Sequence, residues 1–140
     1  MRLGLRTARD LMVPLPKLTM LPVDTPWTDL VRVVAASPFS RIPVYRGTPD
    51  QIIGTLRVKD LVYQYVIDGV GSPLERLVRP VVRVAHDLPA DRVIALLRDK
   101  RVHQAVVTDA SNTAIGLLTI QDVIGAFLVT GTVRVDEVRG

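Results

Sequence analysis

Cysteine is absent from the chain, and its absence removes two kinds of site at once. Without thiols there is neither a disulfide framework nor a thiolate metal site, and an oxidising compartment is not implied. Aromatic residues are also scarce, at 4% of the chain, so the 48% of hydrophobic residues are mostly Val, Leu, Ile and Ala. Aliphatic and β-branched residues at this density favour buried strands with helices packed on them.

Long hydrophobic runs are missing as well. No apolar stretch reaches the ~18 residues that a membrane-spanning helix needs, because Arg, Asp or Gln interrupts each candidate. The N-terminal segment 1–10 contains no apolar stretch of the signal-peptide type. We therefore expect the chain as given to be soluble and to lie in the cytoplasm.

Charge of one sign is not concentrated anywhere along the chain. The 18 Lys and Arg residues exceed the 14 Asp and Glu residues by a net charge of +4, but they are scattered. A nucleic-acid surface usually shows a clustered basic stripe, often with stacking aromatic residues. We expect a solvated, Arg-rich surface and no nucleic-acid partner. Nucleic-acid binding is therefore the weakest functional hypothesis for this chain.

Signatures of catalysis are also missing. The chain has two histidines and no cysteine, and it contains no Gly-x-Ser-x-Gly, His-Glu-x-x-His or P-loop pattern. Its acidic residues do not form an obvious catalytic pair. We predict that the chain is not an enzyme and has neither catalytic residues nor a metal site of its own.

What the chain does contain is an internal repeat. One constant shift along the sequence places the segment 54–60 (GTLRVKD) on the segment 116–122 (GLLTIQD), and it also places Asp29 on Asp91 and Val44 on Val106. Self-similarity at a fixed spacing indicates duplicated structural units. The 140 residues therefore suit two small repeats that share a core.

Each copy predicts a β-α-β-β-α unit. Thr25 before Pro26 and Asp87 before Pro89 are expected to cap the first helix of each unit. The remaining elements are predicted at 18–21, 42–45, 52–56 and 58–67 in the first copy, and at 81–84, 104–108, 114–118 and 120–128 in the second. A unit of ~60 residues buries too little surface alone. The predicted fold class is therefore α/β, with two repeats packed sheet to sheet in pseudo-twofold symmetry around a cleft.

These features resemble a pair of CBS motifs, also called a Bateman module. The specific pattern is Gly-h-h-Thr/Ser-x-x-Asp, where h is hydrophobic, at a strand-to-helix junction; the segment 116–122 matches it fully, and the first copy has Arg57 where Thr or Ser is usual. The resemblance implies a first motif at 7–68, a second at 73–130 and a C-terminal tail at 131–140.

Four segments are similar to the CBS pairs of the CorC/HlyC and cyclin-M family, which is linked to magnesium and cobalt export. They are 9–14 (RDLMVP), 40–45 (SRIPVY), 53–61 (IGTLRVKDL) and 101–107 (RVHQAVV). Members of that family carry a transmembrane domain before the CBS pair. The resemblance implies either an excised cytosolic part of an inner-membrane protein or a stand-alone relative, and it implies a homodimer.

The second motif is suited to an adenine nucleotide, either ATP or AMP, with or without Mg²⁺. By resemblance, Thr119 would contact a phosphate and Asp122 would hold the ribose hydroxyls. The chemistry agrees, because a hydroxyl and the free N–H groups at a helix start donate to an anion and a carboxylate accepts from hydroxyls. Thr-x-x-Asp is also a helix-capping arrangement, and capping is compatible with ligand binding.

Other site residues follow from the resemblance alone. Thr19, Ser40 and Arg41 would complete the site on the second motif, and His103 would face a phosphate. Asp60 and Arg57 form a possible second site, but the bulk of Arg57 favours one functional site over two. The predicted function is thus a regulatory module that controls an attached or partner ion-transport protein; the alternative is a ligand-free structural dimerisation module.

Overall fold

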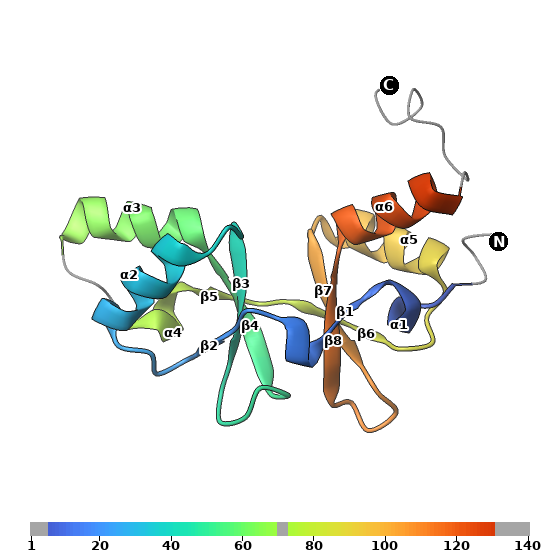
Figure 1. Cartoon of the computed structure of the whole chain (residues 1–140), viewed down its shortest axis with the longest axis horizontal. Helices are drawn as coiled ribbons and strands as arrows, with labels where there is room; N and C mark the ends of the chain where they lie inside the picture. Colours follow the sequence, from blue (N-terminus) through green and yellow to red (C-terminus); the bar gives the residue numbers. More distant parts are fainter. Residues whose placement is uncertain (1–5, 70–72, 131–140) are drawn as a thin grey trace. The chain divides into compact units, whose positions relative to one another are not determined.

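The computed structural model describes residues 6–69 and 73–130, so the predicted C-terminal tail, 131–140, lies outside the described residues. The chain divides into two compact units (Figure 1). The continuous unit is Leu18–Val81. The composite unit joins Met1–Lys17 to Val82–Gly140.

Both repeats have the predicted β-α-β-β-α order, which confirms the α/β fold class. The continuous unit contains β2 (Leu21–Pro22), α2 (Trp27–Ala36), β3 (Arg41–Tyr45), β4 (Ile52–Arg57), α3 (Val58–Asp68), α4 (Leu74–Leu77) and β5 (Val78–Arg79). The composite unit contains α1 (Ala8–Leu11), β1 (Val13–Pro14), the 3-10 turn η2 (Leu15–Lys17), β6 (Val82–Ala85), α5 (Ala90–Lys100), β7 (Gln104–Thr108), β8 (Ala114–Thr119) and α6 (Ile120–Thr130). Within the described ranges, none of these helices is both long and apolar enough to cross a bilayer.

Each unit is built on one four-stranded sheet, and the two sheets exchange a strand. The strand orders are β2-β3-β4-β5 and β1-β8-β7-β6. Strand β1 lies at the beginning of the first motif, 7–68, but pairs antiparallel with β8 of the second. Strand β5 lies at the beginning of the second motif, 73–130, but pairs antiparallel with β4 of the first. Each sheet is therefore completed by a short strand from the beginning of the other motif.

Each unit has its own hydrophobic core on one face of its sheet, under the helices (Figure 1). In the continuous unit, Leu30 of α2 packs with Ile42 and Leu56 of the sheet, and all three are fully buried. In the composite unit, Val93 of α5 and Val123 of α6 cover Leu118 in the same way. Burial of an aliphatic side chain of this size contributes about 1.5–3 kcal/mol, so these contacts hold the helices on the sheets.

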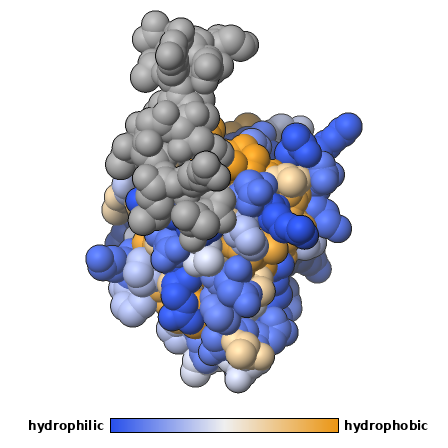
Figure 2. All heavy atoms as spheres, turned by 90° about the vertical axis from the view of Figure 1, so that its right-hand side faces the viewer, coloured by the Kyte–Doolittle hydropathy of each residue, from blue (hydrophilic) through white to orange (hydrophobic). Residues whose placement is uncertain are grey.

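The outer surfaces of the two units differ in their hydrophobic content. Figure 2 faces the composite-unit side of the molecule and shows a mostly hydrophilic surface with hydrophobic residues between. Among the described residues, Ile124 at 38% exposure is the one large exposed hydrophobic residue of this unit. The continuous unit exposes seven, namely Val31, Phe39, Val62, Tyr63, Tyr65, Val66 and Ile67.

A single constant shift does not describe the repeat, so that part of the sequence alignment is wrong. In the ladders, Val44 pairs with Gly54 and Val107 pairs with Gly116, so Val44 corresponds to Val107 rather than to Val106. The difference arises in the hairpin, because the connection from β3 to β4 (46–51) is one position longer than the connection from β7 to β8 (109–113). The shift between the copies is therefore larger by one position before the hairpin than after it.

The predicted helix caps are also wrong. Helices α2 and α5 begin one residue after Pro26 and Pro89, which occupy the N-cap positions with extended backbone. Their carbonyls accept the first helical hydrogen bonds, from the N–H groups of Leu30 and Val93. The Thr25 hydroxyl instead donates to the carbonyl of Pro22, and Asp87 lies in the turn before Pro89.

Candidate functional site

The junction between β8 and α6 brings Thr119 and Asp122 together in a reciprocal cap. The Thr119 N–H donates to Oδ2 of Asp122 at 2.8 Å, and the Asp122 N–H donates to Oγ1 of Thr119 at 3.2 Å. Both residues are half-buried. The capping arrangement anticipated from Thr-x-x-Asp is therefore present, and it holds both side chains in place at the start of an 11-residue helix.

Capping leaves half of each side chain free for another partner. Within the described residues, Oδ1 of Asp122 accepts no hydrogen bond, and the hydroxyl hydrogen of Thr119 is not donated. The N–H of Ile120 donates to the carbonyl of His103, so Gln121 supplies the remaining N–H of the first turn, beside the positive end of the helix dipole. The junction therefore offers donors suited to an anion and one carboxylate oxygen suited to a hydroxyl.

The glycines of the two motifs, Gly116 and Gly54, leave room for a neighbouring strand. A Cβ on Gly116 would lie 2.5 Å from Sδ of Met12 and 2.6 Å from the carbonyl oxygen of Val13. A Cβ on Gly54 would lie 2.3 Å from the carbonyl oxygen of Arg79. The exchanged strands β1 and β5 thus pack directly against these glycines, and a larger residue would push them away.

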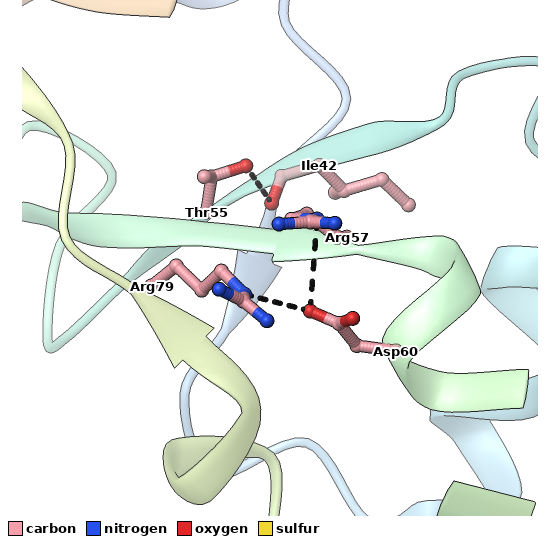
Figure 3. Close-up of polar contacts among 5 residues, drawn as sticks. All are labelled: Ile42, Thr55, Arg57, Asp60 and Arg79. Atoms are coloured by element: carbon pink, nitrogen blue, oxygen red, sulfur yellow. Dashed lines mark hydrogen bonds and ion pairs between the residues drawn. The ribbon is translucent and has the colours of Figure 1, made fainter. Parts of the chain in front are cut away.

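In the first repeat, the position of Thr119 is taken by Arg57, and the corresponding aspartate is already paired. Oδ2 of Asp60 lies 2.8 Å from Nε of Arg79 and 3.8 Å from Nε of Arg57 (Figure 3). The Asp60 side chain is 20% exposed and that of Arg57 is 26% exposed. Arg57 occupies the N-cap position of α3 and provides no capping hydrogen bond. This carboxylate is therefore held by two guanidinium groups.

Sequence reasoning missed Arg79 because the predicted second motif, 73–130, contains it, whereas its strand β5 pairs in the sheet of the first repeat. Without knowing that β5 pairs with β4, nothing in the sequence placed this side chain beside Asp60. It also missed Gln104, which is 9% exposed and has an Oε1 atom with no hydrogen-bond partner among the described residues. Gln104 is the register partner of Thr119, and the corrected alignment makes it the counterpart of Arg41.

The other predicted site residues lie at the edges of their elements. Ser40 is exposed before β3, and its carbonyl accepts the N–H of Val58. His103 is exposed before β7, and its carbonyl accepts the N–H of Ile120, which is the corresponding contact. Thr19 is exposed before β2, and Arg41 is half-buried at the start of β3. Thr19, Ser40 and Arg41 belong to the continuous unit, whereas His103 belongs to the composite unit with Thr119 and Asp122.

Two sheets of this topology, each with the strand-to-helix junction described above, define a class of protein. The CBS domain family matches residues 8–66 and 74–129, and the chain belongs to this family.

Within the family the chain is similar to the CBS parts of CorC-type proteins. It is 31% identical over 116 residues to the magnesium and cobalt efflux protein CorC of Pasteurella multocida, covering 83% of this chain and 39% of that protein. It is 31% identical over 120 residues to Hemolysin C of Rickettsia prowazekii, covering 85% of this chain and 39% of that protein. The chain spans about a third of the length of the curated relatives it matches.

Solved structures with the same fold include nucleotide complexes. The CBS domain of a bacterial CNNM/CorC family Mg²⁺ transporter in complex with ATP superposes with a TM-score of 0.81 at 29% identity, covering 87% of each chain. A CBS-domain pair with bound AMP from Klebsiella pneumoniae superposes with a TM-score of 0.77, covering 88% of this chain and 98% of that one. The second is 21% identical and shows the shared fold.

Proposed function

We propose that this CBS pair is a regulatory module that binds one adenine nucleotide, ATP or AMP, with or without Mg²⁺, at the start of α6. The observation that carries the proposal is the pair of free groups left by the cap, the hydroxyl hydrogen of Thr119 and Oδ1 of Asp122. The hydroxyl and the N–H of Gln121 at the helix start would hold a phosphate. The carboxylate oxygen would accept from the ribose hydroxyls.

Four further residues are proposed to contribute to the same ligand. Arg41 has the planar fork that suits phosphate oxygens, while Thr19, Ser40 and His103 would add polar contacts. Thr19, Ser40 and His103 are exposed, and Arg41 is half-buried. In the first repeat, Asp60 is held by two guanidinium groups, which favours one nucleotide per chain.

The regulated protein is proposed to be an ion transporter of the CorC type, with the module on its cytoplasmic side. Support comes from the names of the relatives and from the fraction of their length that the chain covers, which is 39% for both CorC and Hemolysin C. A transmembrane transport domain would then be the attached or partner protein. The proposal assigns the module no catalysis and no nucleic-acid partner.

We further propose that the module acts as a homodimer, with a second copy on the groove between α2 and α3. This groove has a volume of about 600 Å³ and is lined by Trp27, Thr28, Val31, Val34, Ala35, Val58, Leu61, Val62 and Tyr65. The rings of Trp27 and Tyr65 stack along it, with centroids 6.1 Å apart. An apolar surface of this kind is costly to leave in water, and a second copy brings a matching surface.

Titration calorimetry separates these functions from their alternatives. ATP, AMP and a short DNA duplex are titrated separately into the chain, each with and without Mg²⁺. Saturable binding of ATP or AMP at one site per chain, and no heat from the duplex, is the expected result. A dimer that binds neither nucleotide would instead support a ligand-free dimerisation module.

A further inference from the structure

One part of the composite unit comes from a remote stretch of the sequence. Residues 6–14, which we call the N-terminal strap, contain α1 and β1 and lie against the rest of this unit (Figure 1). The chain connects the strap to the other strands of its sheet only through the continuous unit, Leu18–Val81. Noncovalent contacts therefore hold the strap in place, and its release would break one strand pair, β1 with β8.

The contacts of the strap with the turn before α5 are limited in extent. The N–H of Ala8 donates to the carbonyl of Leu88 at 2.9 Å, and the N–H of Arg9 donates to the carbonyl of His86 at 3.0 Å. The strap places two buried side chains, Ala8 and Leu11, in the core of the unit, and its strand β1 is two residues long. Elements with few buried contacts open locally at a lower free energy than the whole unit. We therefore expect the strap to open and close while the unit stays folded.

The other end of the strap packs on the strand that carries the proposed nucleotide site. In β1, Val13 pairs with Leu117 and Pro14 pairs with Gly116 of β8. Thr119 follows Leu117 by two residues, which is roughly 7 Å along an extended strand. The docked strap therefore helps to fix the end of β8 from which Thr119 projects.

The strap also contacts the helix that follows this strand. Helix α1 lies against α6 as well as against β8 and α5. Leu11 of α1 and Val123 of α6 belong to the same buried cluster. Val123 directly follows Asp122, whose Oδ2 accepts the Thr119 N–H at 2.8 Å. The strap thus touches both elements whose junction holds the undonated hydroxyl and the free carboxylate oxygen.

We propose that the N-terminal strap is a switch whose docking is coupled to nucleotide binding at this junction, an inference that rests on the proposed function. A ligand that contacts Thr119 of β8 and Asp122 of α6 needs both elements in their observed positions, and the docked strap holds both of them. Bound nucleotide then opposes release of the strap. Because coupling between two sites is reciprocal, a force that pulls the strap away weakens nucleotide binding.

Hydrogen exchange of the full chain, followed by NMR with and without AMP or ATP, tests this coupling. The amides of Ala8 and Arg9 report on the strap, because both donate to the turn 86–90. The amide of Ala105 reports on opening of the whole composite unit, because its strand β7 is paired on both sides. Without nucleotide, the strap amides should exchange at least about tenfold faster than Ala105. Equal rates would mean that the strap opens only with the whole unit, and would overturn the switch.

Nucleotide at about a hundred times its dissociation constant should slow exchange at Ala105 about a hundredfold, and at Ala8 and Arg9 at least about tenfold. Slower exchange at Ala105 with unchanged exchange at the strap amides would overturn the coupling and leave the nucleotide site standing. Unchanged exchange at all three amides would refute nucleotide binding itself, and the switch would fall with it.

Leu11→Ala provides the reciprocal measurement. This variant removes buried contacts of the strap, and the apparent affinity falls in proportion to the docked fraction, so calorimetry should show at least about threefold weaker binding of AMP or ATP. Leu74→Ala is the matched control, since Leu74 is equally buried in α4, the short helix that precedes the exchanged strand β5 of the other sheet. Its affinity should stay within about twofold of that of the unchanged chain.

Unchanged affinity of Leu11→Ala, or equal losses in both variants, would show that the strap is a structural element and not a switch. Should Leu11→Ala lose its folded spectrum, the exchange rates of the unchanged chain decide the question, because they need no substitution.

Discussion

Replacing Asp122 by Asn separates its two roles, because the carboxylate has two oxygens and the structure uses one of them. Oδ2 accepts the Thr119 N–H at 2.8 Å, whereas Oδ1 is free within the described residues. An asparagine has a single accepting oxygen, which can preserve the cap, and its other polar atom is a donor. Asp122→Asn should therefore keep the helix start and lose the acceptor proposed for the ribose.

The magnitudes of the two effects differ enough to be measured independently. Asp122→Asn is expected to change the free energy of unfolding by less than about 0.5 kcal/mol, since the capping bond is kept. Its affinity for ATP or AMP should fall by at least about tenfold, because each charge-assisted hydrogen bond is worth about 1.5–3 kcal/mol. Asp122→Ala should lose the same affinity and also about 1 kcal/mol of stability, because the cap is removed.

Urea unfolding and titration calorimetry measure these two quantities on the same samples. Asp91→Asn is the matched control, since Asp91 is an exposed aspartate in the first turn of α5 in the same unit. Nucleotide affinity of Asp122→Asn equal to that of the unchanged chain would refute the site. It would show that Asp122 is a helix cap and nothing more.

Three further perturbations test other parts of the structure. Arg57→Thr alone should leave the binding stoichiometry at one nucleotide per chain, because Arg79 still holds the neighbouring aspartate at 2.8 Å, whereas Arg57→Thr with Arg79→Gln should raise it toward two in calorimetry; a second site in the single variant would contradict the role of Arg79. Gly54→Ala should cost about 1–3 kcal/mol in urea unfolding because its Cβ would meet β5, while Gly125→Ala, with open space around it, should be neutral or stabilising, and equal effects of both would refute the packing argument. Val62→Glu, in the apolar groove, should reduce the mass in light scattering from twice 15.4 kDa to the single-chain value; an unchanged dimer would place the interface elsewhere.

Much of the fold follows from the duplicated pattern. Strands and helices at the junctions 54–60 and 116–122 were predicted nearly at their observed bounds, because alternating and helical periods are local properties of the sequence. The caps at Thr25 and Asp87 were predicted wrongly because a following proline can itself take the N-cap position and offer its carbonyl. The constant shift between the two copies was predicted wrongly, because the one extra residue in the hairpin between β3 and β4 has no signature in the local sequence pattern.

The candidate site was predictable where its residues are close in sequence. Thr119 and Asp122 are separated by less than one helical turn, so their cap could be anticipated from spacing. The pairing of Arg79 with Asp60 joins residues from two elements that the pattern treated as unrelated. They lie together because β5 pairs with β4, and no periodicity of the sequence indicates this pairing.

The strand exchange also constrains how the chain can fold as it is synthesised. The continuous unit, Leu18–Val81, has all its strands within one uninterrupted segment and can form while the rest of the chain is still on the ribosome. Strand β1 leaves the ribosome before any of this, yet its Pro14 must wait for its register partner Gly116 of β8, which is made long after the continuous unit is complete. Strand β1 precedes the continuous unit in the sequence and is nevertheless expected to dock after it. Removal of the segment Met1–Lys17 would leave the continuous unit, Leu18–Val81, intact and would expose the edge of β8, the strand that ends in Thr119.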